Sequence, residues 1–408
     1  MADNTPARPM PEGWDQPAER LWRAGQRMPA IQAAVAAING FGERKPAPRV
    51  LQLAYYLFLI GDYGGAATVL EQLLRQQPEH QEALINLAVC QQRLGRHAEV
   101  LSLSERVLAL QPDLPLALDL RAKSLMRVGR RAEALEAGRL SLDTKDRALP
   151  EPEPPWQPPP HPLAQQVQGK TSVVSFSLWG ANPRYLRGAL RNALLMPDLY
   201  PGWVMRLSLD ETVPEAFVNV MRSLMVDVRV MPSGQSLRQR LCWRFLVAND
   251  PAVGRFVVRD CDSVFSLREV RAVDDWIASG RWFHVIRDWW THTDLMLAGL
   301  WGGVAGVLPD LGPLLTAYQS RQAETPNVDQ WFLRDCVWPL VRRHVLVHDR
   351  LFAVEGRVVL PDPQGNVHIG QDEFAAHRER QQRLLSAWIE RLPCLRLPDD
   401  VPVEAMKR

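Results

Sequence analysis

The spacing of hydrophobic residues changes once along the chain, and this change separates two kinds of predicted structure. Before residue 148, apolar residues recur at helical spacing in stretches separated by glycine, for example residues 83–94 and 98–110 on either side of Gly95. After Lys170, short apolar runs alternate with amphipathic stretches, which is typical of strands followed by helices. The pattern predicts an α-helical N-terminal part and an α/β C-terminal part.

The helical part repeats itself every 34 residues. Gly61, Gly95 and Gly129 stand at this interval, and Pro78 and Pro112 share it. Each unit therefore predicts a helix, a tight turn at the glycine, a second helix, and a proline where the second helix ends. Small or aliphatic residues that let paired helices approach recur at the same interval: Ala66, Val100, Ala134.

The 34-residue period, with glycine in the turns and proline after the second helix, resembles an array of tetratricopeptide repeats. The resemblance covers residues 47–147, and residues 1–46 would form a tail with one capping helix at 17–40. The third unit departs from the pattern, because Gly138 and Ser141 stand where bulkier residues are usual, which suits a terminal repeat. Stacked hairpins form a concave face, so we expect this part to bind a protein or peptide partner. Any other array of helical hairpins would pack by the same rules.

A proline-rich stretch lies between the two parts. Eight of the thirteen residues from 150 to 162 are proline, which excludes a helix or a central strand. We predict a semi-rigid linker over residues 148–168; the alternative is a docking motif for a proline-binding domain. Tryptophan usage also changes here, because none occurs between Arg23 and Pro155 whereas eleven of the fourteen follow Pro162.

The C-terminal part, residues 169–380, predicts a mainly parallel sheet covered by helices on both faces. Its predicted strands are 173–178, 204–209, 226–231, 256–258 and 283–286. The predicted helices are 184–196, 215–225, 240–248 and 267–279, followed by a C-terminal helix and tail at 381–408. Ser266 and Glu269 predict a capping box at the start of the helix 267–279. Ligands of such sheets bind beyond the carboxyl ends of the strands. Polar residues predicted there are Asp210, Asp260, Asp262, Arg287 and Asp288.

Two carboxylates, Asp260 and Asp262, follow the apolar run 256–258 directly. At the end of a strand both side chains can reach one point, and a cation between them relieves their mutual repulsion. Carboxylate oxygens favour hard cations such as Mg²⁺ or Mn²⁺. Such an ion holds a diphosphate and neutralises it as a leaving group. The alternative is an ordinary solvated turn.

Several motifs around these carboxylates recur in a known family. They are Val-Arg-Asp-Cys-Asp-Ser at 258–263, Arg-Glu at 268–269, Phe-His-Val-Ile-Arg-Asp at 283–288, Ser-Leu-Trp-Gly at 177–180, Tyr-Pro-Gly-Trp at 200–203, Trp-Arg-Phe at 243–245, Gly-Leu-Trp-Gly at 299–302 and Asp-Gln-Trp-Phe-Leu-Arg-Asp at 329–335. With them the chain resembles bacterial glycosyltransferase-like proteins of the GT-A type, in scattered blocks over residues 171–372. The resemblance implies a Rossmann-like GT-A fold, a nucleotide-sugar donor, and Asp260 and Asp262 as ligands of a metal–diphosphate.

The same resemblance implies catalytic and further metal-binding residues. Asp329 and Gln330 resemble a pair that many retaining enzymes of this fold place near the transferred sugar, and we expect them in the same pocket as Asp260. The alternative is that Asp329 only caps a helix. We assign Asp288 to catalysis as well. His368, in a His-Ile-Gly motif, resembles a third metal ligand.

Four residues are candidates for binding the nucleotide-sugar: Arg259, Arg268, Arg287 and Trp301. The arginines would contact phosphate, and the tryptophan would stack on a sugar or base together with Trp289 and Trp290. Either Arg259 or Arg268 could equally form a structural ion pair with a nearby carboxylate, and the tryptophans could pack beneath a loop. His284 lies within an apolar strand, where a hydrogen-bonded core histidine is expected.

The segment after Asp288 departs from the family. Relatives carry Arg-Asp-His-Pro and a second histidine, whereas this chain has Trp289 and Trp290 followed by His292 in the place of the second histidine. The departure bears on donor or acceptor specificity. It also leaves open a non-catalytic protein, in which a degenerate transferase-like domain serves only as a scaffold or binding module.

Composition narrows the functional class. The 408 residues suffice for two domains, and 46% hydrophobic with 23% charged residues is ordinary for a globular protein. The formal charge of +2 provides no electrostatic footprint for nucleic acid or an anionic membrane. Five scattered cysteines indicate neither a disulfide framework nor a cysteine-type zinc site. Residues 1–15 lack the apolar core of a secretory signal, and the weakly charged run 295–309 is too short to span a bilayer. We therefore expect a cytoplasmic protein that is not integral to the membrane.

The leading hypothesis from the sequence is an enzyme. Motifs of P-loop nucleotide hydrolases, dinucleotide enzymes, serine hydrolases and zinc proteases are absent from the sequence. We expect a metal-dependent glycosyltransferase that moves a sugar from a nucleotide-sugar donor to an acceptor recruited partly by the repeats.

Overall fold

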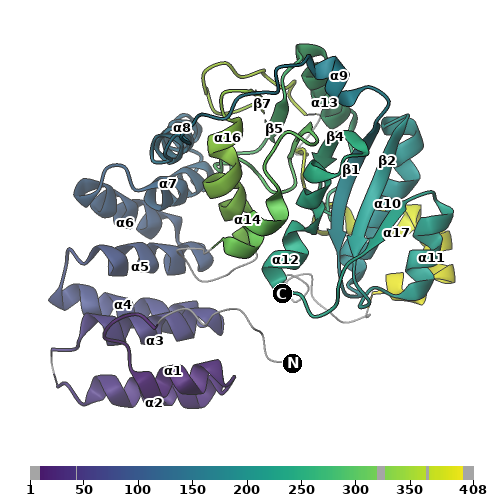
Figure 1. Cartoon of the computed structure of the whole chain (residues 1–408). Helices are drawn as coiled ribbons and strands as arrows, with labels where there is room; N and C mark the ends of the chain where they lie inside the picture. The colour runs from purple at the N-terminus through teal and green to yellow at the C-terminus, as the bar shows by residue number, and fades with distance from the viewer. Residues whose placement is uncertain (1–9, 43, 319–326, 364–366, 398–408) are drawn as a thin grey trace. The chain divides into compact units, whose positions relative to one another are not determined.

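The structure is a computed structural model that describes residues 10–42, 44–318, 327–363 and 367–397 (Figure 1). The chain divides into two compact units, Pro6–Ala148 and Leu149–Arg408. Within the described ranges, no helix is both long enough and apolar enough to cross a bilayer. The predicted combination of a helical part and an α/β part is confirmed.

The N-terminal unit is a series of helical hairpins. Its helices are α1 (Gln16–Arg23), α2 (Arg27–Asn39), α3 (Ala47–Leu59), α4 (Tyr63–Gln76), α5 (Gln81–Arg93), α6 (His97–Leu110), α7 (Pro115–Arg127) and α8 (Arg131–Arg147). Each helix contacts the next one along the chain. Gly61, Gly95 and Gly129 lie in the turns of three hairpins with φ of +86°, +74° and +82°, which glycine adopts readily because it has no Cβ.

The first hairpin corrects one expectation. The single capping helix predicted at 17–40 is two helices, α1 and α2, separated at Gly25 with φ of +76°. The hairpin is attached to α3 by side chains: Trp22 stacks on Tyr56 with 4.2 Å between ring centroids, and the Tyr56 hydroxyl donates to Glu19. Tyr56 is fully buried, so this hairpin belongs to the same core as the repeats.

The C-terminal unit is built on a seven-stranded sheet in the order β3-β2-β1-β4-β6-β5-β7. The strands are β1 (Thr171–Leu178), β2 (Trp203–Leu209), β3 (Asp227–Val230), β4 (Val253–Val258), β5 (Phe283–Arg287), β6 (Trp301–Val304) and β7 (Val345–Asp349). Four neighbouring pairs are parallel, and the two pairs that involve β6 are antiparallel. The strand order reverses between β1 and β4, and open α/β sheets bind ligands at such a point.

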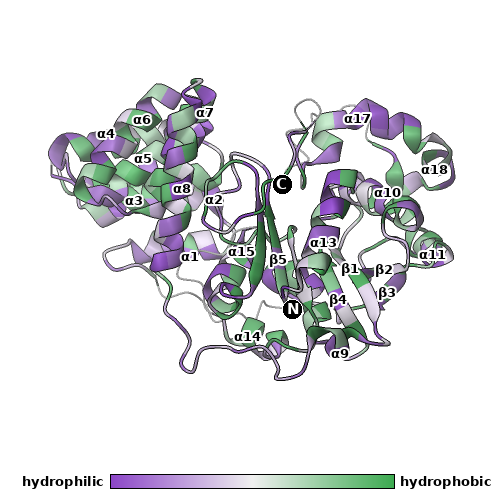
Figure 2. Ribbon diagram, turned by 90° about the horizontal axis from the view of Figure 1, so that it is seen from above, coloured by the Kyte–Doolittle hydropathy of each residue, from purple (hydrophilic) through white to green (hydrophobic). Residues whose placement is uncertain are grey.

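Helices connect and cover these strands. They are α9 (Leu163–Val167), α10 (Pro183–Leu199), α11 (Glu215–Ser223), α12 (Leu237–Cys242), α13 (Leu267–Ser279), α14 (Leu311–Ala317), α15 (Val328–Phe332), α16 (Trp338–Val341), α17 (Glu373–Leu384) and α18 (Ser386–Arg391), with short irregular helices η1 (Trp243–Asn249), η2 (Leu333–Val337) and η3 (Pro393–Leu395). Figure 2 shows apolar residues concentrated in strands such as β5 and polar residues along α17. The C-terminal helix expected from residue 381 begins at Glu373 instead, and residues 398–408 of the expected tail lie outside the described residues.

The strands β6 and β7 were not predicted. The sheet is mainly parallel, as predicted, but β6 runs antiparallel to both of its neighbours and makes it mixed. Two glycines fill the middle of β6 and remove the alternation that marks a strand. The structure explains them, because a Cβ on Gly302 would lie 2.5 Å from the Phe256 carbonyl oxygen and one on Gly303 would lie 2.6 Å from the Phe283 ring. These glycines let β6 fit between its two neighbours.

The proline-rich segment packs on the C-terminal unit. Trp156 lies edge-on to Phe283 and His344, with centroids 5.4 Å and 5.2 Å away, and its Nε1 donates to the Val307 carbonyl at 3.0 Å. Glu151 forms ion pairs with two arginines of the same unit. The segment is therefore part of this unit rather than a free spacer.

The predicted capping box of α13 is half formed. Ser266 accepts from the Glu269 backbone N–H at 3.3 Å, as expected. The Glu269 carboxylate, however, accepts from Arg259 at 2.5 Å and from the Tyr200 hydroxyl at 3.1 Å. The Glu269 carboxylate thus binds the Arg259 guanidinium instead of the Ser266 backbone N–H, because Glu269 lies in the core of the unit.

Candidate functional site

The turn after β4 carries Asp260 and Asp262 at the point where the strand order reverses. Its middle residue, Cys261, is buried, and its Sγ donates to the Ser177 carbonyl of β1 at 3.3 Å. The two flanking carboxylates remain accessible, with 43% of the Asp260 side chain and 16% of the Asp262 side chain exposed. The turn thus presents two carboxylates beyond the carboxyl ends of β1 and β4.

Helix α10 holds this turn in place. Gly188 brings the helix so close that a Cβ there would lie 1.8 Å from the Cys261 carbonyl oxygen. Four residues further along α10, the buried Asn192 donates to the Ser263 carbonyl at 2.8 Å and accepts from the Phe265 N–H at 3.0 Å. The position of both carboxylates therefore depends on a close helix–turn contact.

Arg244 links Asp260 to Asp329. Its guanidinium donates to the Asp260 carboxylate and, at 2.9 Å, to Asp329 of α15. Only 5% of the Arg244 side chain and 4% of the Asp329 side chain are exposed. Burial raises the pKa of Asp329 to about 6, against the opposing effect of the Arg244 charge. Asp329 thus lies beside Asp260 although about seventy residues separate them in the sequence.

The Asp329 carboxylate also accepts from the backbone N–H of the half-buried Gln330 at 2.8 Å. Asp329 lies in the first turn of α15 and not at its N-cap, which is Asn327. The Asp329 side chain therefore binds the Arg244 guanidinium as well as a backbone N–H of its own helix. The catalytic roles of Asp329 and Gln330 stay predictions.

Arg184 binds Asp262 much as Arg244 binds Asp260. This arginine, near the start of α10, forms ion pairs with Asp262 at 2.5 Å and with Asp372 at 2.9 Å, and its guanidinium lies 5.0 Å from the centroid of the Tyr185 ring. Ser263 and Asp372 form a β-bridge, so the segment before α17 lies against the turn. Burial and, next, the charge of Asp260 raise the pKa of Asp262 to about 6.

Three of these residues, Arg184, Arg244 and Asp372, did not stand out as site residues in the sequence. Arg244 belongs to a Trp-Arg-Phe motif at 243–245 that was part of the family resemblance, and this motif was the available signal. Nothing in the local pattern connects Arg184 or Asp372 with the turn.

The charges at this site favour a cation. The four carboxylates Asp260, Asp262, Asp329 and Asp372 face two guanidinium groups, which leaves an excess of two negative charges when all are ionised. Asp260 and Asp262 offer oxygen ligands of the kind that Mg²⁺ and Mn²⁺ prefer, and such ions take their remaining ligands from phosphate and water. Asp260 and Asp262 are therefore the residues of this site that could hold a divalent cation.

His368 does not join this pair, and its assignment to the metal site is corrected. Its ring stacks on Trp289 with 4.5 Å between centroids and lies edge-on to His292 at 5.4 Å. Over the described part of the chain, no three His, Cys, Asp or Glu side chains are arranged to hold a metal. The loop that carries His368 folds onto the Trp289 segment instead.

Asp288 and Arg268 bind each other. Both guanidinium NH2 groups of Arg268 donate to the Asp288 carboxylate at 2.7 Å, and Asp288 also accepts from Arg350 at 2.9 Å and from the Ile369 N–H at 2.8 Å. The Asp288 side chain has no exposed surface. The structure therefore corrects the assignment of Asp288 to catalysis and of Arg268 to phosphate binding, since both hold loops together.

The other candidates for nucleotide-sugar binding are also structural. Arg259 is buried in an ion pair with Glu269, and Arg287 is buried in one with Asp349 at 3.0 Å. Trp301 is fully buried in β6, where its ring lies edge-on to two phenylalanines. All three side chains are buried and occupied by partners within the unit, so their assignment is corrected too.

His292 gives the unit a predictable response to pH. Burial lowers its pKa to about 3, and its Nδ1 accepts from the backbone N–H groups of Asp288 at 3.0 Å and Trp289 at 3.2 Å. The folded protein keeps this ring neutral, whereas the unfolded chain binds a proton below about pH 6.5. Its contribution to stability is therefore present above pH 6.5 and is lost as the pH falls.

For this one histidine, the free energy of unfolding should drop by about 2 kcal/mol between pH 7 and pH 5. His292→Asn keeps an acceptor and removes the titration, so urea unfolding should show a drop smaller by about that amount. Identical pH dependence in both proteins would contradict the role of His292.

Comparisons with known proteins bear on the N-terminal unit. Residues 57–124 match the family model described as tetratricopeptide repeat. The chain contains tetratricopeptide repeats. The match lies within residues 47–147, where the 34-residue period predicted tetratricopeptide repeats, and no curated protein matches the chain.

Solved structures that resemble the chain cover about a third of it. MamA residues 41–end from Desulfovibrio magneticus RS-1 is 22% identical over 31% of this chain and 71% of its own, with a TM-score of 0.29. A crystal structure of MamA is 17% identical over 32% and 70%, with a TM-score of 0.30. A tetratricopeptide repeat protein from Parabacteroides merdae is 19% identical over 32% and 50%, also with a TM-score of 0.30.

Proposed function

We propose that the C-terminal unit is a glycosyltransferase of the GT-A type that takes a sugar from a nucleotide-sugar donor. The observation that carries this proposal is the carboxylate pair Asp260 and Asp262, which lies at the reversal of strand order with an excess of negative charge around it. Tetratricopeptide repeats suggest protein partners, so the N-terminal unit would recruit the acceptor or a protein that carries it.

Each residue of the site has a distinct task in this proposal. Asp260 and Asp262 hold a divalent cation, which when bound neutralises the diphosphate leaving group. Arg244 fixes the Asp260 carboxylate and keeps Asp329 ionised in a buried position. Asp329 and Gln330 lie on the same side of the unit and contact the donor sugar. Arg184 sets the position of Asp262.

Replacing one carboxylate tests the proposal. Asp262→Asn should weaken Mn²⁺-dependent binding of UDP or GDP by about tenfold or more, because one charged oxygen ligand is lost. The melting temperature should change little. Isothermal titration calorimetry of the full chain, with Mn²⁺ and with a chelator, measures the effect, and Asp274→Asn, an exposed aspartate of α13, is the matched control.

A second candidate function is a non-catalytic binding protein. The ion pair of the buried Asp288 with Arg268 favours it, because residues of the motifs that carry the family resemblance are used here to hold loops together. Binding of none of the nucleoside diphosphates UDP, GDP, ADP and CDP, with or without Mn²⁺, would reject the transferase and leave this second function.

A further inference from the structure

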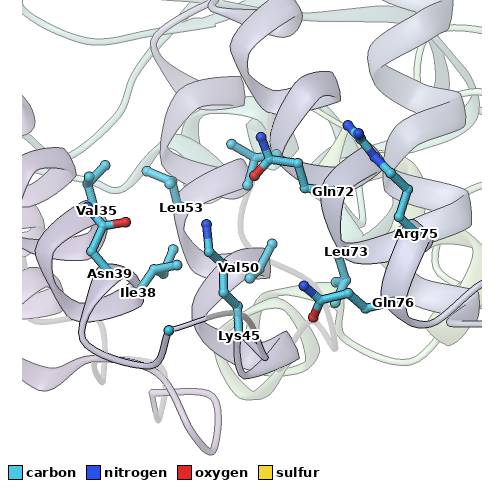
Figure 3. Close-up of a pocket in the computed structure, with 12 residues that line it drawn as sticks. Val35, Ile38, Asn39, Lys45, Val50, Leu53, Gln72, Leu73, Arg75 and Gln76 are labelled. Atoms are coloured by element: carbon cyan, nitrogen blue, oxygen red, sulfur yellow. The ribbon is translucent and has the colours of Figure 1, made fainter.

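The N-terminal unit contains a groove between α2, α3 and α4 with a volume of about 670 Å³ (Figure 3). The second helices of two consecutive hairpins, α2 and α4, form its sides together with α3. Its floor consists of buried aliphatic side chains: Ile38, Val50, Leu53 and Leu73. A hollow of this size is in the range of sites that bind ligands or a few side chains of another protein.

The rim of the groove differs in character from its floor. Lys45 and Arg75 lie at the rim, and the polar residues that accompany them are amides such as Gln72 and Gln76. No aspartate or glutamate lines the groove in the described part of the chain. The aliphatic side chain of Val35 is 39% exposed beside these groups.

These two cations differ from Arg130 and Arg139 of the repeats, which are paired with carboxylates. The exposed Arg130 pairs with Glu133 at 2.6 Å, and Arg139 pairs with Glu136 at 2.6 Å. For Lys45 and Arg75, by contrast, the described residues supply no carboxylate within ion-pair distance. The groove thus combines an apolar floor with two cations that no described carboxylate pairs with.

We propose that this groove binds a short peptide segment of a partner protein, with aliphatic side chains in the groove and one or two carboxylates at Lys45 and Arg75. Burial of the aliphatic side chains supplies the affinity. The two cations fix the orientation of the segment and exclude basic partners, because like charges at an interface are costly. The proposal assigns specific residues to the binding of a protein partner by the repeats. It does not depend on transferase activity.

A selection experiment tests the groove without knowledge of the natural partner. A phage-displayed library of random dodecapeptides is panned on the full chain and on the variant Lys45→Glu/Arg75→Glu. The wild-type chain should enrich peptides that place Leu, Ile or Val beside Asp or Glu. The variant should lose these peptides and enrich ones with Lys or Arg in the acidic positions. One peptide that was enriched on the wild-type chain is then synthesised. Measured by fluorescence anisotropy, it should bind the variant about tenfold or more weakly than it binds the wild-type chain.

Two further variants make the result decisive. Lys123→Glu/Arg131→Glu changes the charge of the repeats by the same amount on α7 and α8, and it should bind the peptide as the wild type does. Val35→Gln removes exposed apolar surface without altering charge, and it should weaken binding. Circular dichroism checks that every variant remains folded, and thermal unfolding followed by tryptophan fluorescence checks that the C-terminal unit is unaffected.

Three outcomes would overturn the proposal. They are the absence of any enriched peptide family, enrichment of basic peptides on the wild-type chain, and equal binding of the selected peptide by the groove variant and the control variant. None of these outcomes bears on nucleotide binding, so a failure here is distinct from a failure of the transferase proposal.

Discussion

Arg244→Met is expected to lower the free energy of unfolding of the C-terminal unit by about 3–5 kcal/mol. The substitution keeps much of the side-chain volume but leaves the carboxylate of Asp329 buried without its ion pair. It also frees the Asp260 carboxylate from its fixed position. Urea unfolding followed by tryptophan fluorescence measures the loss, since eleven of the fourteen tryptophans follow Pro162.

The loss should depend on pH in a defined direction. Burial has already raised the pKa of Asp329 to about 6, and removal of the Arg244 charge raises it further. A carboxyl with a raised pKa is well accommodated when protonated and becomes destabilising as the pH rises through that pKa. The deficit of Arg244→Met should therefore be larger at pH 8 than at pH 5.5.

Two comparison proteins isolate the ion pair. Adding Asp329→Asn to Arg244→Met should recover a large part of the loss, because the uncompensated charge disappears. Arg130→Met removes an arginine whose pair with Glu133 is exposed to solvent, and it should leave the free energy of unfolding nearly unchanged. If Arg244→Met were as mild as Arg130→Met, the buried pair would not have the importance assigned to it.

Gly188→Ala is expected to destabilise the C-terminal unit by about 3 kcal/mol, at the upper end of the usual effect of overpacking. Helix propensity alone would favour alanine by about 1 kcal/mol at this position within α10. The contact with the turn decides whether the substitution stabilises or destabilises the unit. The new Cβ would lie 1.8 Å from the Cys261 carbonyl oxygen, a backbone atom that cannot rotate away. Either α10 or the turn that carries Asp260 and Asp262 has to move.

The displaced turn gives a second readout. Mn²⁺-dependent binding of a nucleoside diphosphate should weaken in Gly188→Ala even at a temperature where the variant is folded. Gly64→Ala, in the first turn of α4, is the matched control, because the nearest atom to its new Cβ is 3.8 Å away. The control should be neutral or slightly stabilising. Equal melting temperatures of the two variants would contradict the close helix–turn contact.

The site shows where sequence reasoning succeeds and where it fails. Asp260, Asp262 and Asp329 were singled out from motifs, and the structure brings them to the same end of the sheet. Arg268 and Asp288 came from equally clear motifs but are occupied with each other. A charged residue in a motif is the signal in every case, and it does not show that Asp260 is exposed whereas Asp288 is buried.

Long-range packing also explains what was missed. The arginines that bind the site carboxylates come from α10 and η1, outside the turn, so the sequence of the turn itself does not connect them with the site. The strand β6 was missed because Gly302 and Gly303 weaken its pattern, and their purpose is visible only beside the rings of its neighbours. His368 was assigned to a metal because its motif is short, whereas its ring stacks on Trp289.

The sequence by itself determined the helical repeats, most strands of the α/β unit and the carboxylate pair after β4. These features follow from interactions between residues that are close along the chain, such as turn glycines, apolar periodicity and a polar end to an apolar strand. Only the tertiary structure decided which charged side chains are accessible and which are paired in the core. Ion pairs such as Arg244 with Asp329 and Arg259 with Glu269 form because folding removes their charges from water, and a buried charge requires a partner wherever in the sequence that partner lies.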